Sequence, residues 1–241
     1  MNGGPSRYHR VLLKLSGAAL QGTSQNSVID QETLNYIAEQ LKSVHSRGVQ
    51  VGVAVGGGNI LRGEQVSLAG IGRATADYMG MLATVINALA LKGALDRLNV
   101  ETRVQSAISM AQVAELYIRE TAIEHLEKNR VLIFAAGTGN PFFSVDTAGA
   151  LRALEIGAEV LLMAKNGVDG VYTADPLLNP QALRYDRISF MDALSQGLGV
   201  MDSTALSLCM DNHLPIVVFD LTNPRNLDRL LSGDEVGTLI S

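Results

Sequence analysis

The chain has 241 residues, of which 47% are hydrophobic and 18% are charged, and its formal net charge is −5. This composition is typical of a globular protein with one large α/β domain or two small ones. A net negative charge without any basic block argues against nucleic acid as a partner. The single cysteine, Cys209, excludes an intrachain disulfide and indicates a reducing compartment. Because the N-terminal stretch lacks the apolar core of a signal peptide, and no apolar run approaches the ~20 residues that span a bilayer, we expect a cytoplasmic protein without a membrane partner.

Predicted strands alternate with predicted helices along the chain. Short apolar runs predict strands, helical spacing of apolar residues predicts helices, and glycines or polar caps mark their ends. In chain order we expect a strand at 10–16, a helix at 30–48, a strand at 49–55, a helix at 74–97, a strand at 102–107, a helix at 112–127, a strand at 130–136, a helix at 146–156, a strand at 159–164, a turn-rich segment at 167–180, a helix at 202–212, a strand at 215–220 and a helix at 223–231.

This alternation predicts an α/β fold with a mainly parallel sheet that helices cover on both faces. The predicted strands are continuous apolar runs, as strands buried on both faces should be. Ligands of such sheets bind at the carboxyl ends of the strands, so the loops that directly follow strands are the candidate sites.

The first such loop is KLSG, residues 14–17. Lys14 lies inside an otherwise apolar strand. A buried, unpaired ammonium group is costly, so we expect Lys14 to meet an anion. The alternative is an edge strand from which the lysine extends into water.

The second loop is GGGNILRG, residues 56–63. Three consecutive glycines let the backbone approach a ligand closely, and their N–H groups can form an anion-binding concavity. Arg62 follows with a planar guanidinium that suits a phosphate group. The alternative is a plain glycine turn beside a solvated arginine.

The third loop is GTGNPFFSVD, residues 137–146, between a predicted strand and a predicted helix. Its glycines expose backbone N–H groups, its threonine, asparagine and serine donate hydrogen bonds, and the following helix offers its N-terminus to an anion. Asp146 either caps that helix or faces the site. Three anion-binding loops at one sheet edge predict a phosphate-rich ligand, or two ligands side by side.

Familiar catalytic motifs are absent from the sequence. It contains no G-x-x-x-x-G-K-[ST], no complete G-x-G-x-x-G, no H-E-x-x-H and no G-x-S-x-G. The four histidines lack metal-ligand spacing and are expected at the surface, and Cys209 is expected to pack inside a helix. Phosphoryl transfer fits these residues, because it needs cations and positioning rather than covalent help from the protein. Lys14 and Arg62 supply the cations, and Asp77, Asp146 and Asp175 are available to orient substrates.

Six stretches that cover most of the chain, from about residue 10 to 240, resemble bacterial uridylate kinases. They are KLSG at 14–17, VGVAVGGGNILRG at 51–63, TADYMGMLATVINALAL at 75–91, GTGNPFFSVDTA at 137–148, GVDGVYTADP at 167–176 and VMDSTALSLCMDNHLPIVVF at 200–219. The resemblance implies the amino-acid-kinase fold, a three-layer αβα sandwich, as a single domain over 1–241. It implies a UMP-binding part at about 10–160 and an ATP-binding part at about 161–241.

The resemblance also implies the reaction and its participants. Mg²⁺-ATP and UMP would give UDP and ADP, reversibly, in the de novo synthesis of pyrimidine nucleotides. The enzyme would be a cytoplasmic homohexamer that GTP activates and UTP inhibits. Mg²⁺ would come with ATP, and no protein residue is assigned as a metal ligand.

Matching positions assign the site residues. Lys14, Arg62 and Asp146 would act in catalysis. The expected ATP contacts are Lys14, Leu15, Ser16, Gly17, Gly58, Arg62, Asn166, Tyr172 and Asp175. The expected UMP contacts are Gly57, Asp77, Thr138, Gly139, Asn140, Pro141, Phe142, Phe143, Ser144 and Val145.

Two residues depart from the family pattern. Ala18 stands where glutamate usually follows KLSG, and Val145 stands where a second threonine usually ends the UMP loop. Val145 removes a hydroxyl group, and with it a side-chain hydrogen bond typically worth ~1 kcal/mol. Two rival functions remain at this point: a kinase of the same fold that acts on a carboxylate or carbamate, and a nucleotide sensor without catalysis.

Overall fold

The computed structural model describes residues 6–22, 27–61, 70–176 and 178–241. Its elements are, in chain order, β1 (Arg10–Leu15), α1 (Ala18–Gln21), α2 (Gln31–Ser46), β2 (Gln50–Val55), α4 (Arg73–Arg97), β3 (Thr102–Ser106), β4 (Glu115–Leu116), α5 (Arg119–Glu127), β5 (Val131–Ala135), α6 (Val145–Glu155), β6 (Val160–Lys165), β7 (Val171–Tyr172), β8 (Arg184–Tyr185), β9 (Arg187–Ile188), α7 (Phe190–Ser195), α8 (Ser203–Asp211), β10 (Ile216–Asp220), α9 (Asn226–Leu231) and β11 (Thr238–Ile240).

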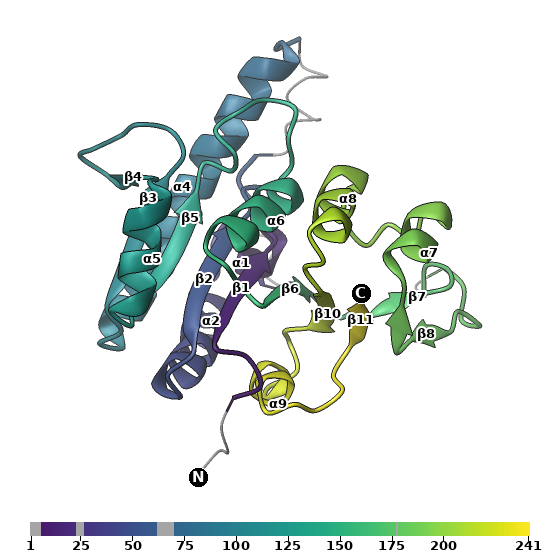
Figure 1. Cartoon of the computed structure of the whole chain (residues 1–241). Coiled ribbons are helices and arrows are strands. Elements are labelled where there is room, and N and C mark those ends of the chain that lie inside the picture. The colour runs from purple at the N-terminus through teal and green to yellow at the C-terminus, as the bar shows by residue number, and fades with distance from the viewer. Residues whose placement is uncertain (1–5, 23–26, 62–69, 177) are drawn as a thin grey trace.

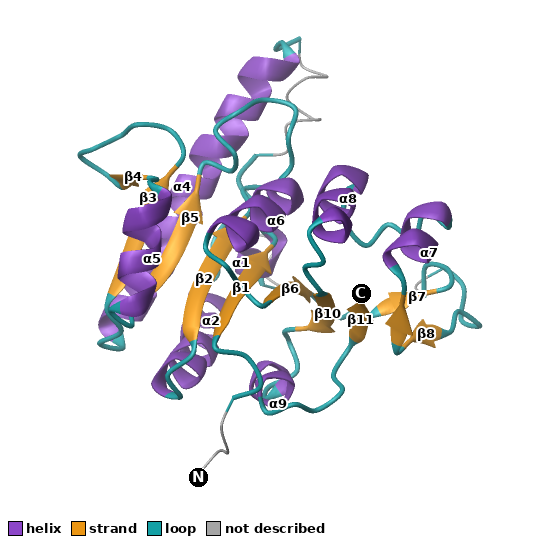
Figure 2. Cartoon of the chain, in the orientation of Figure 1, coloured by secondary structure: helices purple, strands orange, loops and turns teal. Residues whose placement is uncertain are grey.

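Within the described residues, nine strands form one twisted sheet in the order β4-β3-β5-β2-β1-β6-β10-β11-β9 (Figure 2). All pairs are parallel except β10 with β11, which are antiparallel. The prediction of a mainly parallel sheet is therefore confirmed. Strand β1 is central, because it pairs with both β2 and β6. Lys14 consequently lies in an interior strand, and the edge-strand alternative is wrong.

Helices cover both faces of the sheet, as the three-layer prediction requires (Figure 1). Val11, Leu13 and Leu15 of β1 pack into a core with α2, α4 and α9. Leu12 points the other way, into a core with α5, α6, α7 and α8. This alternation follows from the two-residue period of a strand, and burial on both faces explains why the strands are apolar throughout.

The predicted helix at 112–127 is wrong in its first half. Only α5 is helical, and the preceding segment makes β4 at the sheet edge, where Glu115 and Leu116 pair with β3. The backbone N–H of Tyr117 donates to the carbonyl of Ser106 at 2.9 Å, so sheet hydrogen bonds replace the expected helical ones.

The last predicted helix begins three residues late, at Asn226, after Pro224 and Arg225. Arg225 has a φ of 85°, which an α-helix does not permit. The sequence also did not predict α1, α7 or the short strands β7, β8, β9 and β11, which are too short to show a period.

Helix α4 is, in the described part of the chain, the one helix long and apolar enough to cross a membrane by length and composition. This qualifies the expectation that no segment reaches that length. Half of its apolar window is buried inside the fold, as in the core helix of a globular protein. Its buried side packs against β2, β3 and β5.

Candidate functional site

The first candidate residue, Lys14, is paired with an acid. Its Nζ lies 2.5 Å from Oδ1 of Asp146, and the two side chains are only 9% and 17% exposed. The pair forms because α6 packs over β1 at Gly149, where an added Cβ would lie 3.6 Å from the side chain of Lys14. The anion that the sequence requires for Lys14 is therefore present in the protein.

Asp146 does not cap α6, so the capping interpretation of that residue is wrong. Ser144 is the cap, and its Oγ accepts from the backbone N–H groups of Asp146 and Thr147 at 2.9 and 3.2 Å. The hydroxyl of Ser144 donates to the carboxylate of Asp202. Since a serine has a single hydroxyl hydrogen, Ser144 has none left to donate to a ligand in this arrangement.

Asp202 was missed as a member of the site, although the sequence marked it as the start of a helix. Besides Ser144, its carboxylate accepts from Oγ1 of Thr147 at 3.0 Å and from the backbone N–H of Ala205 at 2.8 Å. It thereby joins the N-terminus of α6 to that of α8. A carboxylate at a helix start has many structural uses, so only the fold could show this bridge.

The first two loops pack directly on one another. The backbone N–H of Gly56 donates to the carbonyl of Leu15 at 2.8 Å. An added Cβ at Gly17 would lie 2.5 Å from the backbone nitrogen of Gly58, so only glycine fits there. Arg62, predicted for both catalysis and ATP binding, lies outside the described residues.

The second loop also packs against α4. An added Cβ at Gly57 would lie 2.8 Å from both the side chain of Ala83 and the carbonyl oxygen of Gly80. Close packing therefore requires Gly56 and Gly57, although not Gly58, and the interpretation as a plain turn is wrong.

The third loop has an unusual backbone. Gly137 and Gly139 have positive φ angles, and so do two residues that are not glycine, Ala136 at 61° and Phe142 at 72°. Such conformations persist only where surrounding contacts hold them, and they gather at binding sites. Phe142 is 70% exposed and Phe143 is 49% exposed. These two rings do not pack in the core, and water reaches both of them.

Asp77 of α4 holds this loop. Its carboxylate accepts from the backbone N–H of Phe142 at 2.7 Å and from Nε of Arg73 at 2.8 Å. The sequence predicted a nucleotide contact for Asp77. In this structure it contacts the loop itself.

A cavity of about 220 Å³ lies between the second loop, the third loop and α4. Six of the ten residues predicted for UMP line it: Gly57, Asp77, Thr138, Phe143, Ser144 and Val145. Gly58, which was predicted for ATP, lines the same cavity. Helix α4 adds residues that the sequence reasoning missed: Ala76, Gly80, Met81 and Thr84. The small size of Ala76, Gly80 and Thr84 was the available signal, because small side chains let two loops approach one helix.

Three of the residues predicted for ATP line two further cavities. Tyr172 and Asp175 line one of about 550 Å³, together with Lys165. Asn166 lines another of about 500 Å³, where Tyr36 and Thr222 also lie. The structure thus separates Asn166 from its two expected companions.

Lys165 is a second lysine at this edge of the sheet that the sequence reasoning missed. It ends β6, two residues after Met163, which pairs with Lys14 of β1, and its Nζ donates to the carbonyl of Val200 at 2.8 Å. Burial lowers its pKa, and the charge of Lys14 lowers it further, against the weaker opposing effect of Asp146. A lysine within an apolar strand was recognised at Lys14, and Lys165 escaped notice because it stands at a strand end.

Other titratable groups are structural. Cys209 is fully buried, as expected, and burial raises the pKa of its thiol to about 12. His125 is buried rather than at the surface, with its ring nitrogens 2.8 Å from the carboxylate of Glu115 and 3.1 Å from Arg130. Among the described residues, no group of three or more His, Cys, Asp or Glu side chains is arranged to hold a metal ion.

Comparisons with known proteins agree with this architecture. Residues 9–220 match the amino acid kinase family. The structure is similar to that of a UMP kinase from Bacillus anthracis, with 42% identity, 97% of this chain and 96% of that chain covered, and a TM-score of 0.94.

Two further solved structures extend the likeness. A UMP kinase from Ureaplasma parvum has 42% identity and a TM-score of 0.92, with 98% of this chain and 99% of that chain covered. A uridylate kinase from Archaeoglobus fulgidus has 30% identity and a TM-score of 0.75, with 96% and 99% covered. The family model matches most of this chain, and solved structures of the family cover nearly all of it. The chain therefore belongs to the amino acid kinase family.

Proposed function

We propose that this chain is a UMP kinase that transfers the γ-phosphoryl group of Mg²⁺-ATP to UMP, reversibly, giving UDP and ADP in pyrimidine nucleotide synthesis. The similarity to UMP kinases at 42% identity over nearly the whole chain supports it. The observation within the site that carries it is Lys14, held by Asp146 where three glycine-rich or polar loops converge.

The acceptor needs no general base in this reaction. The second pKa of a phosphate monoester is about 6, so the attacking oxygen of UMP is already ionised at neutral pH. The protein supplies positioning and positive charge instead. The ammonium of Lys14 and the N-terminus of α6 both lie at this edge of the sheet and would stabilise the negative charge of the transferring group.

Asp146 keeps Lys14 in one orientation, and we assign it a catalytic role through that contact. Arg62 is assigned a second cationic role on its sequence match alone. Magnesium usually keeps several water ligands and is bound through substrate phosphates, so we write it as part of the substrate Mg²⁺-ATP.

The two nucleotides occupy different parts of the site in this proposal. The cavity between Gly57, Asp77 and the third loop takes UMP, with the loop over Thr138–Val145 around its phosphate. Because the hydroxyl hydrogen of Ser144 is donated to Asp202, the phosphate is bound by backbone N–H groups there. The valine at position 145 then lowers the affinity for UMP only slightly, because a backbone N–H binds phosphate whatever the side chain is.

ATP takes the other side. The proposed phosphate contacts are Lys14–Gly17 and Gly58, and Tyr172 and Asp175 line the cavity of about 550 Å³ that suits the adenine nucleoside. We keep Asn166 as a proposed ATP contact only because its position matches the pattern of uridylate kinases. The nucleosides follow the proposed division of the chain, with UMP at about 10–160 and the adenine nucleoside at about 161–241, while the ATP phosphates reach back to Lys14–Gly17 and Gly58.

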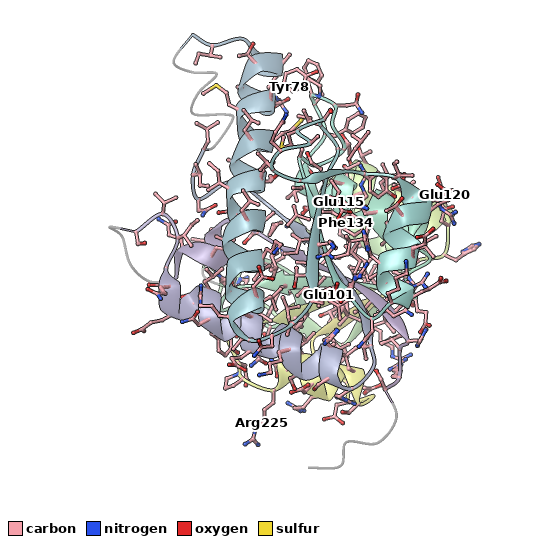
Figure 3. All side chains as sticks on the ribbon, turned by 90° about the vertical axis from the view of Figure 1, so that its left-hand side faces the viewer. Tyr78, Glu101, Glu115, Glu120, Phe134 and Arg225 are labelled. Atoms are coloured by element: carbon pink, nitrogen blue, oxygen red, sulfur yellow. The ribbon has the colours of Figure 1, made fainter. Side chains whose placement is uncertain are left out.

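Self-association is the other part of the proposal. The outward side of α4 carries Tyr78, Leu82, Ile86 and Leu89, which are 46%, 52%, 51% and 37% exposed. Their spacing puts them on one face of the helix, and Tyr78, near the start of α4, is labelled in Figure 3. Such an apolar stripe suits a second copy of the chain, and we propose a cytoplasmic homohexamer with GTP as activator and UTP as inhibitor.

The test is ADP release from Mg²⁺-ATP with UMP, CMP, dUMP, aspartate, N-acetylglutamate and carbamate offered separately. UMP should be turned over far faster than the carboxylate and carbamate acceptors. Turnover with one of those acceptors instead would identify a kinase of different specificity. Binding of UMP and ATP without turnover would identify a sensor.

A further inference from the structure

The two non-glycine residues with positive φ in the third loop are both held by α4. The third loop, together with Ala136 before it, is called the UMP loop below. Ala136 begins it in a left-handed conformation and is completely buried, and Phe142 repeats that conformation near its end. Residues with a Cβ rarely adopt this conformation unless neighbouring contacts hold them.

Each of these residues donates its backbone N–H to a side chain of α4. Phe142 donates to Asp77 at 2.7 Å, and Ala136 donates to Oγ1 of Thr84, also at 2.7 Å. Asp77 and Thr84 are seven residues apart, which is two helical turns, so they lie on the same face of α4. Helix α4 packs against β5, from which the loop departs (Figure 3).

Thr84 does more than bond to its own helix. Its hydroxyl donates to the carbonyl of Met81 at 2.7 Å, a hydrogen bond to the preceding turn that threonine often makes in helices. The same oxygen accepts from Ala136, which removes an otherwise unpaired N–H at a fully buried position. An unpaired buried N–H is costly, so without the hydroxyl the start of the loop would have to shift.

The shift would reach the nucleotide site directly. Thr84 lines the cavity of about 220 Å³ together with Gly57, Gly137 and Thr138. Gly137 and Thr138 follow Ala136 in the chain, so a rotation at Ala136 moves both of them.

The same face of α4 also holds the second loop. The side-chain amide of Asn87, which is fully buried, donates to the carbonyl of Gly56 and to Oδ1 of Asn59, both at 2.7 Å. Asn87 lies three residues after Thr84. One helix therefore sets the positions of both loops that line the cavity.

We propose that Thr84 is a positioning residue for UMP, whose hydroxyl fixes the left-handed conformation of Ala136 and thereby the phosphate-binding N–H groups of the UMP loop. This proposal rests on the proposed UMP kinase activity. It concerns how the acceptor is bound and leaves the ATP side unaffected.

The experiment compares Thr84→Val, which keeps the shape and removes the hydroxyl, with Thr84→Ser, which keeps the hydroxyl. Thr84→Val should raise KM for UMP about tenfold or more and change KM for ATP less than about twofold. Thr84→Ser should stay within about threefold of the wild type for both substrates.

Thr102→Val is the matched control. Thr102 is equally buried, and its hydroxyl donates to the carbonyl of Val100 at 3.0 Å at the opposite end of the sheet. It should lower Tm without changing either KM. An unchanged KM for UMP in Thr84→Val, or an equal rise in Thr102→Val, would overturn the proposal.

Hydrogen exchange of peptides covering 134–142 tests the same contact without turnover. Thr84→Val should speed exchange there relative to peptides of α2, and Thr84→Ser should not. If the wild type does not phosphorylate UMP, the proposed function fails, while faster exchange would still establish the contact. If Thr84→Val does not fold, Thr84→Ala takes its place, and wild-type exchange in its 134–142 peptides would overturn the proposal.

Discussion

Lys14 shows how a single residue can carry a prediction from sequence to geometry. It lies in the central strand with 7% of its surface exposed, and Asp146 compensates its charge at 2.5 Å. Removing one partner of a buried pair leaves the other charge uncompensated, which costs more than the pair itself contributes. In the proposed reaction the same ammonium faces the transferring phosphoryl group.

Lys14→Met should lower kcat about 10²- to 10³-fold and change KM for UMP less than about threefold, because the lost charge acts on the transition state. Asp146→Asn should shift kcat in the same direction by a smaller factor, since the lysine remains but loses its fixed orientation. Steady-state ADP release measures both. A kcat equal to the wild type in Lys14→Met would remove Lys14 from the chemistry.

Cys209 should be inert in the folded protein. Burial, with a smaller effect of the Asp202 charge, raises the pKa of its thiol to about 12, so about one molecule in 10⁴ carries the thiolate at pH 8. Ellman's reagent should therefore react only as the protein unfolds, at a rate that follows the denaturant concentration. Fast labelling of native protein would show that the site of Cys209 opens locally.

Because of Lys165, the free energy of unfolding should depend on pH in the alkaline range. Burial and the charge of Lys14 lower its folded pKa below the usual 10.5. Between those two pKa values the unfolded chain binds the proton and the folded chain does not, so the free energy of unfolding rises with pH in that window. At lower pH the buried charge is a penalty in the folded state.

Lys165→Met lacks this penalty. The unfolding free energy of the wild type minus that of the variant should therefore increase from pH 7 toward about pH 10, as measured by urea denaturation. Titrating groups that do not interact with Lys165 cancel in the difference. A difference that stays constant with pH would mean that Lys165 keeps its ordinary pKa in the fold.

At the scale of elements, some helix starts were predictable, although the cap of α6 was not Asp146. Asp30 was expected to open a helix, and its carboxylate accepts from the backbone N–H of Thr33 at 2.8 Å at the start of α2. The six main strands were also predicted, because a strand buried on both faces is apolar throughout. The prediction of a helix over 112–118 was wrong, because β4 forms by pairing with β3, and the local sequence does not reveal that partner.

In the candidate site, too, features set by the local sequence were predictable and contacts between distant residues were not. Loops after strands were predictable from the topology rule, and so were the glycines that close packing requires. The bridges across the site were not: Asp202 with Ser144, and Thr84 with Ala136, join residues 58 and 52 positions apart. Their side chains have ordinary helical roles in sequence, and only the fold shows their second partners.

The turn before β11 depends on one glycine. Gly237 has a φ of 79°, and an added Cβ would overlap the carbonyl oxygen of Val218 and lie 3.0 Å from its carbon. Gly237→Ala should therefore lower the free energy of unfolding by ~2–4 kcal/mol, measured by chemical denaturation. The control is Gly233→Ala, which is also left-handed (φ 98°) but has open space around the added Cβ. Equal losses in both variants would show that backbone strain alone, without the overlap, explains the effect.

For the whole molecule, the two sides of helix α4 have different roles. Its buried side holds both substrate loops through Thr84 and Asn87, and its outward side carries the apolar stripe that begins at Tyr78. A partner that docks on the stripe would contact the same helix that positions the loops. Assembly and activity are therefore expected to change together.

Leu82→Asp should dissociate the assembly, because a charge in the middle of an apolar interface would lose its hydration. Sedimentation velocity should show smaller species, and kcat should fall with them. Leu183→Asp is the control, since Leu183 is 72% exposed and lies away from α4, between β8 and the preceding turn. Identical sedimentation of wild type and Leu82→Asp would remove the stripe from the interface.

The position of β11 makes one edge of the sheet depend on the last residues of the chain. This strand, Thr238–Ile240, lies between β10 and β9, although β9 precedes β10 in the chain. In a chain cut before residue 238, the backbone of β10 would have one unpaired edge and β9 would have no partner in the sheet. An exposed edge of this kind can pair with another chain, so loss of a few C-terminal residues to a protease should make the protein aggregate.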